Sequence, residues 1–359
     1  MQLSRRRFLE LALGTSSSAL ALASCGDRQD NAALRKAKQL NIYSWPDYIY
    51  KDAIPDFEKR YGIKVVYDTV SSNEGLLAKL QAGAANYDII VPTNYIVKKL
   101  RELKKIQPIQ HDRLKNFGNL MPRFVNSKYD PGCKYSIPYT FGTTGIAYNR
   151  KAPCFVDSPP GDWDSFWDKK VSGRITLLED MRESIGMSLK RNGHSFNTTD
   201  EATIRAACED LKVQKALNMC YTSDQVIVYL TSGDSWLSLS FSGDAQQAAH
   251  ENSDVKYIIP RSGSSMWMDT LCIPASAPHP ENAHLWLDYM LEPEVAARVS
   301  NATYYATPNK NALKMVDANL RADENLYPPE HILDRCEEIA DIGKALFIYD
   351  RLWTELKCV

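Results

Sequence analysis

The sequence lacks the short motifs that mark several common classes of enzyme. It contains no GxGxxG, no GxxxxGK followed by Ser or Thr, no GxSxG and no HExxH. The glycine-rich turns that cradle phosphates, the nucleophile of an α/β-hydrolase and the paired histidines of a zinc protease therefore have no counterpart. We expect a chain that binds a ligand without transforming it, with no cofactor and no metal site.

The chain is also short of net charge and of long apolar runs. Its 43 basic and 44 acidic residues give a formal charge of −1, which supplies no field to attract nucleic acid. No apolar run reaches the roughly 18 to 20 residues that a membrane-spanning helix needs. At 359 residues, the chain exceeds the roughly 250 to 300 residues that one core can serve. We expect two lobes and no nucleic-acid partner.

Cysteine is present without a metal-like or redox-like spacing. After Cys25 there are seven cysteines and no CxxC pair, so zinc and thioredoxin chemistry are not indicated. In an oxidising compartment some of them would pair, and the odd number leaves at least one thiol without a partner in the same chain. Burial as small apolar side chains is an equally good interpretation for Cys208, Cys220 and Cys272.

Residues 1–24 have the pattern of an export signal peptide. Three arginines, Arg5 to Arg7, precede a weakly apolar stretch broken by Gly14. The segment resembles the twin-arginine export signal, although a general secretory route could use the same charges. Its removal takes away three basic residues and one acidic residue, so 40 basic and 43 acidic residues remain and the formal charge becomes −3.

The residues before Cys25 resemble a bacterial lipobox, Leu22-Ala-Ser-Cys25. Cleavage there would leave Cys25 as a lipid-bearing N-terminus, held at the membrane because each buried CH₂ contributes about 0.8 kcal/mol. The alternative is an ordinary cysteine near a cleavage site. Residues 25–38 are mostly polar and predict a flexible tether. Together these features predict a periplasmic protein tethered to the membrane.

Strands and helices alternate in the first part of the mature chain. We expect strands over 40–45, 63–67 and 87–91, and helices over 54–61 and 75–81, the second behind a capping box at 71–74. This order favours a parallel sheet whose ligand lies beyond the carboxyl ends of its strands. Trp45 and residues 93–95 fall at those ends.

The remaining pattern predicts a second α/β unit and two connections. The glycine-containing segment 135–149 and the segment 269–273 are expected to be extended and to cross between lobes, with helices and strands from 162 to 259 between them. We assign residues 39–143 plus about 270–315 to the first lobe, and 144–269 plus about 316–359 to the second. Helices are expected over 281–291 and 293–300.

Aromatic residues stand beside carboxylates at several predicted strand ends. Trp45 and Tyr48 flank Asp47, and Trp267 lies two residues before Asp269, on the same face of an extended chain. An aromatic ring attracts an alkylammonium by about 0.5 to 2 kcal/mol, and a carboxylate adds a charge-assisted hydrogen bond. Each element also has a plainer interpretation, as a core ring or as a charge at a helix start.

Seven stretches, in order along the chain, resemble those of bacterial periplasmic spermidine/putrescine-binding proteins, the solute receptors of polyamine ABC transporters. The stretches cover residues 42–48, 57–65, 72–74, 87–95, 137–142, 267–274 and 305–309. The resemblance implies a type II periplasmic-binding fold, an α/β architecture with two lobes, crossing segments and a ligand cleft between them. It also implies a membrane-embedded permease, with its ATPase, as partner, and spermidine or putrescine as ligand.

Carried over by motif, the resemblance predicts a set of ligand-binding residues. Its aromatic walls are Trp45, Tyr48, Tyr95, Trp267 and Tyr305; its carboxylates are Asp47, Asp180, Glu183 and Asp269; its hydroxyls are Thr93 and Ser223. Two positions depart from the family pattern, because Phe241 replaces a common Trp and Ile339 replaces a Gln that spermidine binders can offer. Both changes remove a polar group, so they bear on which polyamine is preferred.

The expected mechanism is closure of the two lobes around a cation that contacts both lobes only in the closed state. Three alternatives stay open. The same fold could bind another cationic solute or ferric ion, for which Tyr304-Tyr305 would be candidate ligands. A secreted hydrolase could use Cys133 or Cys272 with His279. A purely structural lipoprotein would bind nothing.

Overall fold

The computed structural model describes residues 38–70, 72–83 and 86–358. The predicted signal peptide, Cys25 and nearly all of the predicted tether lie outside these described residues. Within them, no helix is both long enough and apolar enough to cross a membrane.

The described chain alternates between strands and helices. The strands are β1 (Gln39–Ser44), β2 (Lys64–Thr69), β3 (Ile89–Ile90), β4 (Ser136–Asn149), β5 (Ile175–Leu177), β6 (Asn218–Tyr221), β7 (Leu237–Phe241), β8 (Val255–Ile258), β9 (Ser265–Cys272) and β10 (Glu337–Glu338). The α-helices are α2 (Ala53–Tyr61), α3 (Asn73–Gln81), α4 (Asn94–Glu102), α5 (Pro122–Val125), α6 (Met181–Arg191), α7 (Glu201–Lys215), α8 (Val226–Ser232), α9 (Ser242–Glu251), α10 (Pro280–Met290), α11 (Pro293–Thr303), α12 (Ala318–Arg321), α13 (Glu330–Leu333) and α14 (Leu346–Cys358).

The first β-α-β-α-β unit forms as the sequence predicts. β1 pairs in parallel with both β2 and β3. Helix α2 ends at Gly62, which adopts the left-handed conformation (φ 65°) that favours glycine. The hydroxyl of Ser72 caps α3 by accepting a hydrogen bond from the backbone N–H of Gly75. The helix therefore begins at Asn73, two residues before the predicted start.

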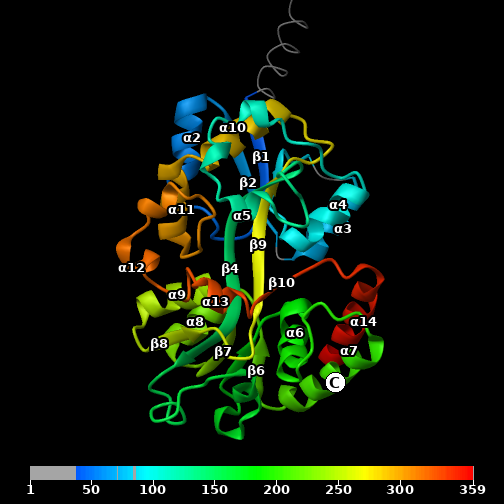
Figure 1. Cartoon of the computed structure of the whole chain (residues 1–359), viewed down its shortest axis with the longest axis vertical. Helices are drawn as coiled ribbons and strands as arrows, with labels where there is room; N and C mark the ends of the chain where they lie inside the picture. The colour runs from blue at the N-terminus through cyan, green and yellow to red at the C-terminus, as the bar shows by residue number, and fades with distance from the viewer. Residues whose placement is uncertain (1–37, 71, 84–85, 359) are drawn as a thin grey trace, which may run out of the picture.

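Two long strands run through the molecule and join its two halves (Figure 1). β4 pairs with β9 through Thr143, and from Thr144 onward it pairs with β7 and β8. β4 therefore changes partners between Thr143 and Thr144. β9 pairs with β3 and with the first half of β4, so Trp267 and Asp269, which were expected at the end of the second lobe, stand on the same sheet as β1 and β3. β10 pairs in parallel with β9 and forms a third connection.

Each half has a mixed sheet with helices packed on it, and the antiparallel pairs are those that β4 forms with its neighbours and that β9 forms with β3 (Figure 1). In the first lobe the strand order is β2-β1-β3-β9-β4, and in the second it is β4-β7-β5-β6, with β5 parallel to both β6 and β7. Helices α10 and α11 cover the first sheet, and Trp286 of α10 is 2% exposed against Phe57. Helices α6, α7 and α14 contact one another in the second lobe. This arrangement sets the carboxyl ends of β1 and β3 in one lobe, and of β5, β6 and β7 in the other.

The seven cysteines that the structure describes are all free thiols, so the pairing considered from the sequence is not seen among them. Three are buried, namely Cys133, Cys208 and Cys272. Burial in the core, the alternative interpretation for Cys208 and Cys272, is confirmed. Cys220, given the same interpretation, is only half-buried.

Candidate functional site

One face of β9 carries the centre of the candidate site. Ser265, Trp267 and Asp269 alternate along the strand, and residues two apart on a strand point to the same side. The rise of about 3.4 Å per residue separates the first from the last by about 13 to 14 Å. Each of the three contacts a different group of polar or aromatic residues. The face is therefore suited to an elongated ligand with several attachment points.

Asp269 lies at one end of this face and is held only by hydroxyl groups. Thr93 Oγ1 donates to its Oδ1 at 2.7 Å and the Tyr48 hydroxyl donates to its Oδ2 at 2.5 Å. Tyr48 also shares a 2.6 Å hydrogen bond with Thr140. Asp269 is 6% exposed, and its burial raises its pKa to about 6, against which the two hydroxyl donors act. No basic side chain forms an ion pair with it among the described residues.

A second carboxyl, that of the half-buried Asp244, was not among the predicted site residues. It lies in the first turn of α9, directly after β7, and the hydroxyl of Tyr305 donates to its Oδ1 at 2.5 Å. This hydrogen bond links the two lobes. Burial raises the pKa of Asp244 to about 6, and the neighbouring charges of Asp224 and Asp47 add to the shift. The signal that could have revealed Asp244 is its place just beyond a parallel strand, the rule already applied to Trp45.

Two more carboxyls, Asp180 and Glu183, lie at the start of α6, just beyond β5. Asp180 caps the helix, since its Oδ1 accepts from the backbone N–H groups of Arg182 and Glu183 at 2.8 and 3.0 Å. Ser265 Oγ donates to Glu183 Oε2 at 2.6 Å. Burial raises the pKa of both carboxyls, and for Glu183 the charge of Asp180 acts in the same direction. Capping the helix therefore occupies only one carboxylate oxygen of Asp180, and it does not explain why the Glu183 carboxyl is buried.

Tyr95 of α4 faces this pair of carboxyls from the first lobe. Its pKa is raised mainly by burial, and also by the charges of Glu74 and Asp180. Arg182, 2% exposed, lies with its guanidinium carbon 5.7 Å from the Tyr95 ring centroid and donates to the carbonyl of Ala340 at 3.1 Å. The hydroxyl of Tyr95 donates to Glu74 Oε1 at 3.4 Å, and the pKa of Glu74 is raised by the loss of water around its carboxyl and by the charge of Asp180.

Aromatic rings fill the space between these carboxyls. Trp267 makes edge-to-face contacts with Phe241 and Tyr305, with ring centroids 5.6 and 5.4 Å apart. Tyr48 contacts Tyr305 at 5.4 Å and Tyr139 at 5.6 Å. Because Trp267 and the Asp269 partner Tyr48 both touch Tyr305, the strand face and the aromatic wall form one continuous surface. Edge-to-face rings of this kind leave ring faces available to a cation.

The structure brings most of the predicted site residues into contact and leaves others at the margin. Trp45 follows β1, is half-buried and accepts a hydrogen bond at its carbonyl from Tyr67. Asp47 is exposed and has a left-handed backbone (φ 51°). Ser223 follows β6 next to Asp224. Within the described ranges, no hydrogen bond or ring contact joins these three residues to the other predicted site residues. The charges of Asp47 and of Asp224, the neighbour of Ser223, act on the pKa of Asp244. The residues in contact with one another are Tyr48, Thr93, Asp269, Tyr305, Trp267 and Phe241, with Tyr95, Asp180 and Glu183 grouped beside Arg182.

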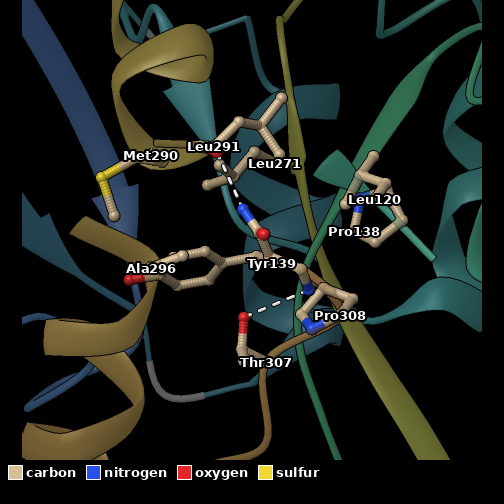
Figure 2. A pocket seen from close by; sticks show the side chains of 10 residues that line it. Leu120, Pro138, Tyr139, Leu271, Met290, Leu291, Ala296, Thr307 and Pro308 are labelled. Carbon is tan, nitrogen blue, oxygen red and sulfur yellow. Dashed lines mark hydrogen bonds between the residues drawn. The ribbon is translucent and has the colours of Figure 1, made fainter. Parts of the chain in front are cut away.

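The lobes are closed on one another in this structure. A cavity of about 10 Å³ lies inside the first lobe, behind Tyr139 and between Met290, Leu271 and Pro308 (Figure 2). This volume suits at most one water molecule. A second, of about 20 Å³, lies between Tyr95 and Lys99 of one lobe and Arg182 and Asp341 of the other. Ligand pockets measure roughly 300 to 1,000 Å³, so neither of these two cavities could hold a ligand of the usual size.

Comparison with known proteins agrees with this geometry. Residues 52–327 match the model of a family described as bacterial extracellular solute-binding proteins. The chain belongs to this family. It is 36% identical to the spermidine/putrescine-binding periplasmic protein of Escherichia coli, over 89% of this chain and 91% of that protein. It is 32% identical to the putrescine-binding periplasmic protein PotF of the same species, over the same shares.

A solved structure shares the fold of this solute-binding protein. It is described as a putative spermidine/putrescine ABC transporter from Listeria monocytogenes, with a TM-score of 0.86 and 35% identity over 89% of this chain and 99% of that one. The predicted α/β fold with two lobes and the resemblance drawn from the sequence are therefore confirmed. The two named relatives are periplasmic binding proteins, and the solved structure is described as that of an ABC transporter.

The thiols proposed as alternative nucleophiles do not form a catalytic arrangement. Burial raises the pKa of Cys133 to about 12 and also raises that of Cys272. A thiol that stays protonated is a poor nucleophile. His279 instead has its Nδ1 3.0 Å from the carboxylate of Asp88. The geometry thus gives no support to a hydrolase.

The paired tyrosines considered as iron ligands face different surroundings. Tyr305 contacts Trp267 and Tyr48, whereas the ring of Tyr304 lies 5.5 Å from that of His250. Tyr304 takes a left-handed conformation (φ 59°) at the end of α11, which turns the two side chains apart. Coordination of one ferric ion by both phenol oxygens would require the two side chains to point to the same place. This arrangement therefore gives no support to an iron site at Tyr304 and Tyr305.

Gly243 sets how closely the lobes of this solute-binding protein approach. A Cβ atom there would lie 2.3 Å from Cε1 of Tyr305, far inside normal contact. We expect Gly243→Ala to hold the lobes apart and lower ligand affinity about tenfold, since the Tyr305–Asp244 hydrogen bond would lengthen.

Gly118→Ala is the matched control, because a Cβ atom there meets nothing within 4 Å and the backbone is not left-handed. Small-angle scattering and calorimetric titration would compare both variants with the parent chain. Equal affinities for Gly243→Ala and Gly118→Ala would contradict this role for Gly243.

Proposed function

We propose that the chain captures a polyamine, a linear aliphatic chain with two or three ammonium groups, between its lobes. The observation that carries this proposal is that three carboxyls, two of them buried (Asp269 and Glu183) and one half-buried (Asp244), are partnered by hydroxyl groups. None of the three forms an ion pair with a basic side chain in the described chain. A carboxylate in such surroundings is costly unless a cation joins it. Ammonium groups of a ligand supply those cations.

The aromatic wall supports the same ligand class. Methylene groups of a polyamine would pack on Trp267, Tyr305 and Phe241, which exclude water, while ring faces attract the adjacent ammonium groups. The relatives are named spermidine/putrescine-binding and putrescine-binding proteins, and these names agree with the same ligand class. Phe241 and Ile339 remain the two positions that bear on which polyamine is preferred.

The ligand acts by drawing the lobes together. Tyr48, Thr93, Tyr305 and Trp267 belong to the first lobe, whereas Asp244, Phe241 and Glu183 belong to the second. A cation that contacts both sets does so only when the lobes are closed, so it shifts the population toward the closed form. The closed complex would then deliver the amine, unchanged, to a membrane permease of an ABC importer. The protein acts as a receptor and not as an enzyme.

Isothermal titration calorimetry tests the proposal directly. Putrescine and spermidine are expected to bind, and 1,4-butanediol, which has the length of putrescine without its charges, is expected not to bind. Ferric ion serves as the competing ligand class. Binding of ferric ion or of the diol in preference to both amines would overturn the proposal.

We also propose that the protein reaches the periplasm by the twin-arginine route and is held there by lipid on Cys25. Support comes from Arg5 to Arg7, from the lipobox-like residues 22–25 and from the polar residues that follow. Mass spectrometry of the mature N-terminus would show a diacylated or triacylated Cys25. An unmodified N-terminus at any other residue would contradict the anchor and leave the ligand proposal untouched.

A further inference from the structure

Two indole N–H groups of the candidate site have no hydrogen-bond acceptor. The Nε1 atoms of Trp267 and Trp45 are buried from solvent and meet no partner in the part of the chain that the structure describes. Other tryptophans do find one: Trp163 Nε1 donates to the carbonyl of Gly263 at 3.0 Å, and Trp167 Nε1 to that of Asp210 at 3.3 Å. Leaving a buried donor without an acceptor lowers the equilibrium constant for folding or binding by a factor of about 5 to 150.

The surroundings of Trp267 explain why its own protein supplies no acceptor. Its ring neighbours are Phe241, which has no polar atom, and Tyr305, whose hydroxyl donates to Asp244. The benzo edge of the indole lies over Gly142, where a Cβ atom would come within 2.6 Å of Cζ2. The indole N–H therefore meets no acceptor among the described residues, and a ligand in the site could supply one.

An unmodified polyamine does not meet this need, because protonated amines are hydrogen-bond donors only. A ligand carboxylate would accept the hydrogen bond, but it would lie among Asp269, Asp244 and Glu183, and like charges at short range repel. The acceptor that remains is a neutral one, such as an amide carbonyl oxygen.

We propose that the site also takes N-acylated polyamines, with the free ammonium end on the buried carboxyls and the amide carbonyl accepting from the indole N–H of Trp267 or Trp45. This proposal rests on the polyamine function proposed above and narrows its ligand class. Phe241 offers an apolar surface for the acyl methyl group, and Ile339, 2% exposed and bonded through its N–H to Met266 of β9, offers a second.

Acylation removes one ammonium group of the ligand, and a carboxyl of the site can compensate by staying protonated. A carboxyl that no longer meets a cation can keep its proton, because burial raises the pKa of both Asp269 and Asp244 to about 6. The neutral carboxyl then stays hydrogen-bonded to the hydroxyl of Tyr48 or Tyr305, as in the present structure. No buried charge is left uncompensated.

The test is a calorimetric titration of three ligands that share a four-carbon chain with a free ammonium end: putrescine, N-acetylputrescine and 4-aminobutyrate. The parent chain is expected to bind the first two and not the third, whose carboxylate would be repelled. Trp267→Phe keeps an aromatic ring and removes the N–H. This substitution is expected to lower the affinity for N-acetylputrescine at least fivefold more than the affinity for putrescine. Trp45→Phe repeats the measurement for the second indole, and thermal unfolding checks that both variants fold.

A selective loss for the acylated ligand in either variant supports the proposal, since the lost ring area affects both ligands and cancels in the ratio. Failure of the parent chain to bind N-acetylputrescine, or equal losses for both ligands in both variants, would overturn it. If the parent chain binds neither putrescine nor spermidine, the polyamine function itself fails. Binding of putrescine without N-acetylputrescine refutes only the acylated ligand class.

Discussion

Replacing Asp269 by Asn is expected to lower the affinity for putrescine about 100-fold, while the ligand-free chain stays folded. Removing one partner of a buried ion pair costs about 3 to 5 kcal/mol. We expect the low end of this range, because the amide oxygen can still accept from one of the two hydroxyls, Thr93 or Tyr48, while the amide NH₂ donates to the other. The shape of the site is kept, so the loss reports on charge. Calorimetric titration measures the affinity and thermal unfolding measures the stability.

The stability of the Asp269→Asn variant separates a binding role from a structural one. Among the residues that the structure describes, Asp269 has no basic partner, and its pKa is raised by burial. A carboxyl of this kind destabilises the folded chain when it is ionised, so at pH 7.5 we expect the variant to unfold at an equal or higher temperature.

Asp234→Asn is the matched control for net charge. Asp234 is exposed before β7, at the opposite end of that strand from Asp244. Its substitution should leave the affinity unchanged. An Asp269→Asn variant that binds putrescine as tightly as Asp234→Asn would remove Asp269 from the site.

Affinity for putrescine is expected to rise about 100-fold from pH 5 to pH 7.5. Asp269 and Asp244 both have a pKa of about 6 in the ligand-free chain, and each must lose its proton to pair with an ammonium group. At pH 5, one unit below that pKa, each carboxyl is about nine-tenths protonated, so each lowers the apparent affinity about tenfold. The ligand's amines stay protonated across this range, since alkylammonium groups titrate near 10.

Protons should leave the protein as the amine enters. Titrations at pH 6 in buffers of different ionisation enthalpy are expected to show release of about one proton from these two carboxyls together. Glu183, whose pKa is raised by burial and by Asp180, would add to the release. An affinity that is flat from pH 5 to pH 8, with no buffer-dependent heat, would show that these carboxyls do not meet the ligand.

The stability of the ligand-free chain should change in the opposite direction. Both carboxyls have a folded-state pKa above the unfolded value of about 3.9, so the folded chain binds more protons near pH 5 to 6 than the unfolded chain does. Their contribution to the free energy of unfolding therefore grows as the pH falls from about 7 toward 4. The groups with lowered pKa, among them Asp200, Glu201 and Asp254, stay ionised above pH 5 and do not oppose this trend.

Differential scanning calorimetry with and without putrescine would resolve the two effects. We expect the melting temperature of the ligand-free chain to hold or rise from pH 7.5 to pH 5.5, while the increment caused by the ligand shrinks. Parallel loss of both quantities would indicate general acid unfolding and contradict the assignment.

Local sequence patterns were sufficient to predict much of the architecture. The alternation over residues 40–91 predicted the parallel β1-β2-β3 unit, and the extended segment at 135–149 predicted β4 as a crossing strand. Helices α4, α8, α9 and α14 were not predicted. α8 and α14 contain valine, isoleucine or aromatic residues that are weak helix formers, and packing against neighbouring elements decides their state.

The candidate site divides in the same way. Aromatic residues next to carboxylates, together with the family resemblance, led to Trp267, Asp269 and Glu183, because a strand's two-residue period and a helix start are local features. Asp244 was missed. Its partner Tyr305 lies 61 residues away in the sequence, and no local pattern states that β7 ends opposite the end of α11.

The sequence by itself determined the class of the protein, its two-lobed fold and the kinds of side chain offered to a ligand. These depend on periodicity, on residue type and on short motifs, each contained in a few consecutive residues. Only the tertiary structure decided that, in the described part of the chain, Asp269, Asp244 and Glu183 meet hydroxyls and no basic partner, and that two indole N–H groups find no acceptor there. Burial and the absence of a partner are properties of the whole surroundings of a group, and those surroundings exist only once distant segments have packed together.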